Sequence, residues 1–178
     1  ADVSDKIISV VRNIKIDPRE FMIASILAKK IAAGSQYVLI DLPTGKTAKL
    51  VGRDEAHEVG GLFTSIGHAL KLKVDCIISP GDRPIGSMIG PALEAKDCLT
   101  ILQNDGGSSD LRTKALSLAG IILESQNWCP RGYGFEYAQD ILTSGKAYSK
   151  FQEIVEAQGG DKEIKVDVRI IAATNKDL

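Results

Sequence analysis

The sequence predicts an α/β fold that is rich in helix and contains a parallel βαβ unit. Two short apolar runs, at residues 37–41 and 73–79, are continuous rather than alternating, which is typical of strands buried in a parallel sheet. A stretch of helical length, residues 53–70, separates them despite the pair Gly60-Gly61 in its middle. Strand, helix and strand in this order predict two parallel strands joined by a right-handed crossover.

The first helix is expected to begin at Asp17-Pro18 and to end at Gly34. Aspartate is a favourable N-cap residue, and proline suits the first helical position. Glycine commonly ends a helix because it adopts the left-handed conformation that follows the last turn. After the first strand, the tract from Pro43 to Lys49 is typical of a turn-forming loop.

Further helices and one strand are expected after the second strand. A loop rich in glycine and proline, residues 80–90, comes first, and Pro91 then suits the start of a helix. Asp110 is predicted to cap another helix. The expected elements are helices at 91–102 and 111–125, two short helices on either side of Ser144-Gly145, and a strand at 164–171.

The composition is that of an ordinary globular protein. Apolar residues make up 44% of the chain, and 22 Lys and Arg against 23 Asp and Glu give a formal charge of −1. No basic excess points to nucleic acid. No apolar run approaches the roughly 20 residues that cross a bilayer. We therefore expect neither nucleic acid nor a membrane as a partner, and a cytoplasmic location.

Neither the cysteines nor the histidines predict a metal site. Cys76, Cys98 and Cys129 are odd in number and far apart, so they fit neither a disulfide framework nor a zinc site. His57 and His68 are separated by 11 residues on one predicted helix, about 16 Å at about 1.5 Å per residue. They cannot share a metal ion. Reduced thiols and no bound metal are the expectation.

The tripeptide Gly45-Lys46-Thr47 after a strand suggests a nucleotide-binding P-loop. That motif needs a further glycine five residues before Gly45, so that backbone amides can surround the phosphate. The residue at that position is Ile40, which lies inside the predicted strand. The sequence therefore excludes a P-loop.

Four segments, taken in their order and spacing, resemble one family of enzymes. They are residues 16–18 with 24–30, residues 39–49, residues 83–95 and residues 144–161. The most specific strings are Pro-Ile-Gly followed by Gly-Pro-Ala-Leu-Glu-Ala, within residues 84–95, and Ala-Gln-Gly-Gly-Asp at the end of the last segment. Over about residues 12–161 the chain is similar to the thymidine phosphorylase and AMP phosphorylase family of pentosyltransferases.

Within that family, the chain looks most like the archaeal AMP phosphorylase branch. The loop at residues 41–49 and the Gly-Pro-Ala-Leu-Glu-Ala string carry this likeness. The bacterial thymidine branch typically has Arg-Asp-Val-Thr before the first helix, whereas this chain has Arg-Asn-Ile-Lys at residues 12–15. The resemblance therefore implies AMP or thymidine as the substrate, and the likeness is greater to the AMP branch.

The resemblance implies phosphorolysis of an N-glycosidic bond. Inorganic phosphate, the co-substrate, attacks C1′ of the sugar while the base leaves through an oxocarbenium-like transition state. The products are the free base and a pentose 1-phosphate, or ribose 1,5-bisphosphate if AMP is cleaved. The implied ligands are a nucleoside or nucleoside monophosphate and phosphate, without a cofactor. Family members are dimers through a helical lobe, so a homodimer is expected.

By the same resemblance, Asp17 is the catalytic proton donor. A purine anion leaves poorly unless it is protonated, and a positioned acid typically contributes about 10²–10⁴-fold. The residue types alone leave a second interpretation open, in which Asp17 is only the N-cap before Pro18. The two roles conflict in part, because a capping carboxylate has a lowered pKa and a general acid needs a raised one.

The resemblance assigns substrate binding to Ser25, Lys29 and Lys49. Ser25 lies about two helical turns after Asp17, so it projects from nearly the same face, and Lys29 is one turn farther. The family uses this serine on the nucleotide and, in its thymidine branch, this lysine on the base. The residues alone instead favour a small packed residue for Ser25 and a solvated charge beside Lys30 for Lys29.

Lys49 ends the loop after the first strand, where open α/β sheets bind ligands. A lysine there suits a phosphate group, with Lys46 in the same loop as its competitor. The resemblance also implies a cation site, seen in some relatives, at Asp97 and the carbonyls near Ile85 and Met88.

Three segments are expected along the chain. Residues 1–34 correspond to part of the helical lobe, residues 35–158 to part of the α/β catalytic domain, and residues 159–178 to a strand-like tail that leads to a further domain. Nothing in residues 1–17 resembles the family's phosphate-binding segment. We therefore expect the central part of a longer phosphorylase, inactive or nearly so alone. The alternative is a non-catalytic nucleotide-binding or assembly module that retains the fold.

Overall fold

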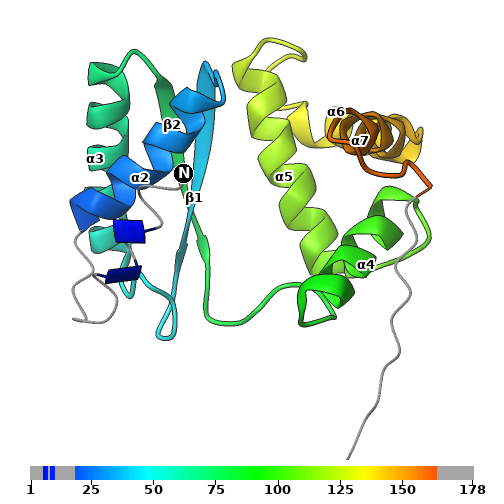
Figure 1. The fold of residues 1–178 in the computed structure, drawn as a ribbon, viewed down its shortest axis with the longest axis horizontal. Coiled ribbons are helices and arrows are strands. Elements are labelled where there is room, and N and C mark those ends of the chain that lie inside the picture. Colours follow the sequence, from blue (N-terminus) through cyan, green and yellow to red (C-terminus); the bar gives the residue numbers. More distant parts are fainter. Residues whose placement is uncertain (1–5, 8, 11–18, 164–178) are drawn as a thin grey trace, which may run out of the picture. The chain divides into compact units, whose positions relative to one another are not determined.

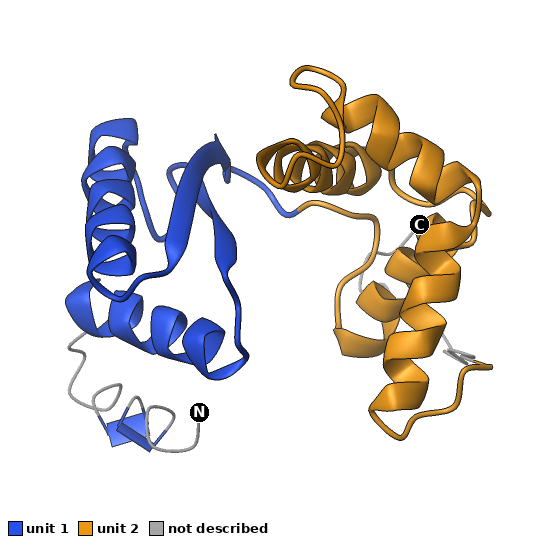
Figure 2. Ribbon diagram, turned by 90° about the horizontal axis from the view of Figure 1, so that it is seen from above, with its two compact units in different colours: residues 1–84 blue, residues 85–178 orange. Residues whose placement is uncertain are grey.

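The computed structural model describes residues 6–7, 9–10 and 19–163. The chain divides after Pro84 into two compact units, residues 1–84 and 85–178 (Figure 2). Each unit has its own hydrophobic core. Within the described ranges, no helix is both long and apolar enough to cross a membrane.

Unit 1 contains the predicted βαβ arrangement (Figure 1). Its elements are α2 (Arg19–Ala32), β1 (Tyr37–Thr44), α3 (Arg53–Ala69) and β2 (Lys73–Pro80). The two strands pair in parallel, in a register that runs from Tyr37 opposite Lys73 to Thr44 opposite Pro80. The expected pair of parallel strands joined by a helix is confirmed. The predicted helix start at Asp17-Pro18 lies outside the described residues.

Both strands extend farther than the sequence predicted. The expected strands ended at Asp41 and Ser79, with Pro43 in a loop, whereas β1 continues to Thr44 and β2 to Pro80. Proline lacks an N–H and is therefore excluded from a central strand but tolerated at an edge. Since the sheet has two strands in the described part of the chain, each strand has an outer edge that tolerates a missing N–H.

The core of unit 1 forms where α2 and α3 pack against one face of the sheet. Val38 and Leu42 of β1 and Val74 of β2 lie on this face and are buried, whereas Leu39 and Ile77 on the opposite face are half-buried. Burying one large apolar side chain stabilises the fold by about 1.5–3 kcal/mol. The core residues contributed by the two helices are Ile23, Leu27, Ala56, Val59 and Phe63.

Glycines allow α3 to approach the sheet closely. A Cβ on Gly67 would lie 2.4 Å from Cγ2 of Val74, and a Cβ on Gly60 would lie 3.4 Å from Cδ1 of Leu42. At Gly61, the same added Cβ would have nothing within 4 Å. Packing against the sheet therefore compensates for the helix propensity that Gly60 and Gly67 lack, about 1 kcal/mol each. Nothing in the structure explains Gly61.

Unit 2 is helical in its described residues (Figure 1). Its elements are α4 (Pro91–Leu102), α5 (Ser109–Ser125), α6 (Gly134–Thr143) and α7 (Lys146–Ala157). All four were expected, but the predicted cap of α5 is wrong. The N-cap residue is Ser108, and Asp110 lies in the first turn, where a carboxylate is favoured by the helix dipole. The strand expected at residues 164–171 lies outside the described residues.

The core of unit 2 depends on close contact between α5 and α6. A Cβ on Gly134 would lie 2.3 Å from the carbonyl oxygen of Gly120, so the backbones meet where neither helix has a side chain. The N–H of Gly134 donates to Oε1 of Glu124 at 2.7 Å. The buried residues of this core are Ile101, Leu116, Ala138 and Leu142.

Candidate functional site

Two loops meet at the carboxyl ends of β1 and β2, where open α/β sheets place their ligands. The first, residues 45–49, is closed by a hydrogen bond from the N–H of Gly45 to the carbonyl of Leu50 at 3.1 Å. The second follows β2, and its Gly81 donates an N–H to the carbonyl of Thr44 at 2.7 Å. A Cβ on Gly81 would lie 2.9 Å from Cβ of Pro43, so glycine at this position lets the second loop lie against the end of β1.

Asp82 fixes the first loop from the second. Its Oδ1 accepts a hydrogen bond from the backbone N–H of Lys46 at 3.1 Å, and a Cβ on Gly45 would lie 2.5 Å from the same oxygen. No sequence motif identified Asp82 as a site residue. Its only signal was its place directly after Gly81 in a glycine- and proline-rich loop, which is too general to assign a role.

The lysines of the first loop are both exposed. Lys46 is held through its backbone by Asp82, whereas Lys49 directly precedes Leu50, whose carbonyl closes the loop. Lys49 also has a polar or charged interaction of its own. The loop therefore presents two cationic side chains at the carboxyl end of β1, on a backbone that is already ordered.

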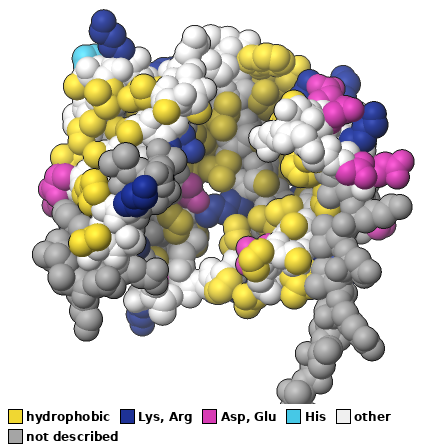
Figure 3. Space-filling view, viewed as in Figure 1, with side chains coloured by type: hydrophobic (Ala, Val, Ile, Leu, Met, Phe, Trp, Pro, Cys, Tyr) yellow, Lys and Arg dark blue, Asp and Glu magenta, His cyan; other side chains and the backbone are white. Residues whose placement is uncertain are grey.

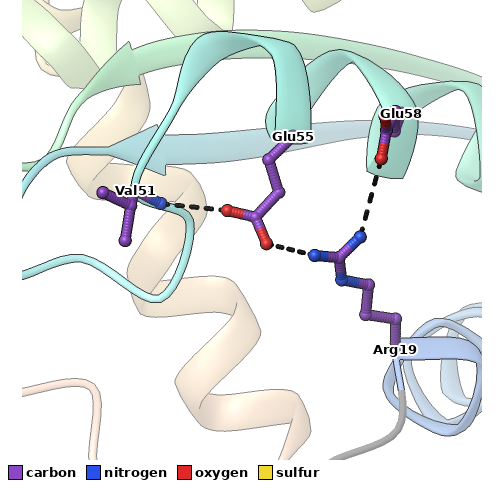
Figure 4. Close-up of polar contacts among 4 residues, drawn as sticks. All are labelled: Arg19, Val51, Glu55 and Glu58. Carbon is purple, nitrogen blue, oxygen red and sulfur yellow. Dashed lines mark hydrogen bonds and ion pairs between the residues drawn. The ribbon is translucent and has the colours of Figure 1, made fainter.

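An ion-pair cluster ties the start of α2 to the start of α3 (Figure 4). The guanidinium of Arg19 contacts Glu55 through Nη2 and Glu58 through Nη1, the latter at 3.6 Å. The other carboxylate oxygen of Glu55 accepts the N–H of Val51 at 3.2 Å. Glu55 therefore connects the loop that carries Lys49 to the first residue of α2.

The structure places Ser25 and Lys29 on α2, one helical turn apart. Ser25 is buried, at 8% exposure. Lys29 is exposed and has an interaction of its own. Asp17, the predicted proton donor, lies outside the described residues. Ser25, Lys29 and Lys49 thus all lie in unit 1. The contact between Arg19 and Glu55 joins α2, which carries Ser25 and Lys29, to the start of α3, which follows the loop with Lys49.

Asp97, which was implied as a cation ligand, lies in unit 2 and is 2% exposed. Its Oδ2 accepts hydrogen bonds from the N–H and hydroxyl of Ser87, at 2.8 and 3.3 Å, and its Oδ1 accepts the N–H of Ser108 at 3.3 Å. These bonds satisfy the buried carboxylate and order the loop before α4. Over the described residues, no cluster of three His, Cys, Asp or Glu could hold a metal ion.

Asp110 completes this loop from the first turn of α5. Hydrogen bonds lower the pKa of Asp110, first from the hydroxyl of Ser108 and then from the backbone N–H groups of Leu111 and Gly86. A Cβ on Gly86, whose φ is +88°, would lie 2.9 Å from Oδ2 of Asp97. Glycine at position 86 therefore has a backbone reason, because this positive φ and the close Asp97 oxygen disfavour any side chain.

No family model matches the chain. Among curated proteins, AMP phosphorylase of Pyrococcus abyssi is 49% identical over 165 residues, which is 93% of this chain and 33% of that enzyme. AMP phosphorylase of Methanothrix thermoacetophila is 42% identical over 165 residues, 93% of this chain and 32% of that enzyme. The chain is homologous to the AMP and thymidine phosphorylase family. It spans about a third of the length of these relatives.

A bacterial member of the phosphorylase family gives a similar match. The putative thymidine phosphorylase 1 of Acidovorax is 44% identical over 163 residues, 91% of this chain and 32% of that protein. The resemblance inferred from four motifs is thus confirmed at the level of the family. The identity to archaeal AMP phosphorylases, up to 49%, agrees with the branch that the loop at residues 41–49 indicated.

Proposed function

We propose that this chain forms the nucleotide-binding part of a cytoplasmic, homodimeric phosphorylase that cleaves AMP with inorganic phosphate, releasing adenine and ribose 1,5-bisphosphate. The observation that carries the proposal is the 49% identity to an AMP phosphorylase over 93% of the chain. Two features of unit 1 support it. They are a lysine-bearing loop at the carboxyl end of a parallel strand and a buried serine on α2.

In the proposed reaction, a phosphate oxygen forms a bond to C1′ while the bond from C1′ to the base nitrogen breaks. The electron pair of the broken bond stays on the base, and Asp17 supplies the proton that neutralises it. Ser25 hydrogen-bonds the nucleotide. Lys29, one turn farther along the same helix, contacts the base. Lys49 binds the 5′-phosphate as a point charge.

The ion-pair cluster at Arg19 supports this arrangement. Arg19 is two residues from Asp17, and Glu55, its partner, also holds the N–H of Val51, two residues from Lys49. Catalytic groups act efficiently only when they are held in the reacting geometry. We therefore assign Arg19 and Glu55 as positioning residues that hold the start of α2 relative to the lysine-bearing loop.

The proposal is tested by grafting this chain into a known enzyme. The segment of P. abyssi AMP phosphorylase that matches this chain is replaced by the corresponding residues of this chain, and phosphate-dependent adenine release is measured. We expect the grafted enzyme to cleave AMP, with thymidine a poorer substrate. A grafted enzyme that folds and dimerises but releases no base would favour the alternative, a non-catalytic module that retains the fold.

A further inference from the structure

Unit 2 carries a hollow of about 290 Å³ between α6 and the loop that precedes it. None of its residues belongs to the segments that carry the proposed phosphorylase site. It is lined by three aromatic residues and two acidic residues, together with Cys129 and Pro130. The rings belong to Trp128, Tyr133 and Tyr137, and the carboxylates to Glu136 and Asp140.

The aromatic side chains of this hollow are unusually exposed. Trp128 is 69% exposed, Tyr133 63% and Tyr137 40%. Single exposed apolar residues are common on protein surfaces, but clustered exposed aromatics mark interaction sites. Large rings lose little conformational entropy when they bind a ligand, because they have few rotatable bonds.

The backbone around the hollow is already fixed. The N–H of Trp128 donates to the carbonyl of Leu123 at 2.9 Å, and the N–H of Tyr133 donates to the carbonyl of Pro130 at 3.2 Å. The start of α6 is held against α5 by the hydrogen bond from Gly134 to Glu124 at 2.7 Å. A ligand would therefore bind without the cost of ordering the loop backbone.

The charge around the hollow is negative. Glu136 and Asp140 are four residues apart on α6, so they lie on one stripe of the helix with Tyr133 and Tyr137. Residues 126–143 contain these two acids and one basic residue, Arg131, which does not line the hollow. Glu124 adds a third carboxylate close enough to raise the pKa of Cys129, although desolvation is the larger cause of that rise.

We propose that the aromatic hollow binds an alkylammonium cation. The faces of Trp and Tyr rings carry negative partial charge and attract a cation within about 6 Å of the ring centre, with Trp the strongest. The carboxylates of Glu136 and Asp140 add direct charge complementarity. The volume is just below the range of about 300–1,000 Å³ typical of small-molecule sites, so it suits a trimethylammonium group or a single lysine side chain rather than a nucleotide.

The test uses the fluorescence of Trp128, the only tryptophan of the chain. The chain of residues 1–178 is titrated with choline and with 3,3-dimethylbutan-1-ol, which has the same shape without the charge. We expect saturable quenching by choline and binding of the neutral alcohol that is about tenfold weaker or less. N-acetyl-lysinamide is titrated in the same way, as a model of a lysine side chain. Tighter binding of choline indicates a free quaternary amine as the natural ligand, and tighter binding of the lysine derivative indicates a lysine side chain.

Substitutions distinguish a cation site from an apolar hollow. We expect Glu136→Gln with Asp140→Asn, and separately Tyr137→Ala, to weaken choline binding about tenfold, while Tyr137→Phe keeps it. Glu153→Gln with Glu156→Gln on α7 removes the same two charges outside the hollow and should have no effect. The proposal is overturned if the alcohol binds as well as choline. It is equally overturned if neither cation gives a saturable response in a chain whose helical circular dichroism is intact.

Discussion

Lys46 and Lys49 share one loop, but the structure gives their backbones different roles. The N–H of Lys46 donates a hydrogen bond to Asp82. Leu50, the residue after Lys49, closes the loop by accepting a hydrogen bond at its carbonyl. Lys49 therefore lies at the base of the loop, next to β1, while Lys46 lies at the contact with the second loop. Lys49 directly precedes Leu50, which bridges to Thr44 at the carboxyl end of β1, where a nucleotide phosphate is expected.

Lys49→Ala in the grafted enzyme should weaken the binding of AMP more than that of adenosine. A hydrogen bond to a charged group contributes about 1.5–3 kcal/mol, so we expect KM for AMP to rise about tenfold or more while kcat changes little. Steady-state kinetics with both substrates measure the difference, with Lys46→Ala as the matched variant. An equal loss for AMP and adenosine would instead favour the thymidine-type interpretation.

The thiol of Cys76, on the core side of β2, has a raised pKa that makes its reactivity a measure of burial. Burial is the main cause that raises the pKa of Cys76, with a smaller rise from the charge of Asp75 and an opposing hydrogen bond from Thr64. Because the folded-state pKa exceeds the unfolded one, the fold favours the neutral thiol. This contribution to stability is complete below the unfolded pKa and declines as the pH rises through the folded pKa.

Alkylation of Cys76 by iodoacetamide should therefore require a higher pH in the folded chain than in urea. Only the thiolate reacts, so the midpoint of the rate against pH follows the pKa of the thiol. Mass spectrometry of the peptide that contains Cys76 gives the rate at each pH. A midpoint in the folded chain equal to or below that in urea would show that Cys76 is solvated.

At the scale of elements, the packing of α3 on the sheet depends on where its glycines lie. Gly67→Ala would bring the new methyl group to 2.4 Å from Cγ2 of Val74, whereas Gly61→Ala meets nothing within 4 Å. Overpacking of this kind typically costs about 1–3 kcal/mol. An exposed helical Gly→Ala change instead stabilises by about 0.5–1 kcal/mol.

We therefore expect opposite effects on the urea midpoint of unfolding, a decrease for Gly67→Ala and an increase for Gly61→Ala. The pair controls for helix propensity, because both substitutions add the same methyl group to the same helix. Circular dichroism at 222 nm follows both transitions. If Gly67→Ala also stabilised the chain, the close contact of α3 with Val74 would be wrong.

Most elements could be predicted from the sequence because their signals are local. Continuous apolar runs marked β1 and β2, and Pro91 marked the start of α4. The ends of the strands could not be predicted, because Pro43 is a breaker in a central strand and acceptable at an edge, and the number of strands is not a local property. The cap of α5 was misassigned since Ser108 and Asp110 are both good capping residues two positions apart.

The candidate site was predictable only where a family motif covers it. Ser25, Lys29 and Lys49 were named from the resemblance, and their elements were then found in one unit. The contacts of Glu55 with Arg19 and of Asp82 with the backbone of Lys46 each join residues 36 apart in the sequence. No local pattern encodes such pairs, because they depend on how α2, α3 and the two strands pack together.

At the scale of the whole molecule, the chain spans about a third of the length of its relatives. Residues 1–178 alone should show no measurable phosphorolysis of AMP or thymidine, because the family's phosphate-binding segment has no counterpart in the sequence. Phosphate-dependent release of adenine or thymine, followed by chromatography, measures this. Robust release of free base by these residues alone would mean that a phosphate site exists within them.

The most direct test of the proposed function is the turnover of the grafted enzyme with Asp17→Asn. Asparagine caps a helix as well as aspartate but cannot donate a proton as an acid. We predict that kcat for AMP falls by about 10²-fold or more, with a smaller change in KM and a nearly unchanged melting temperature. Unchanged turnover together with a lower melting temperature would contradict the account, because Asp17 would then be only the cap of its helix.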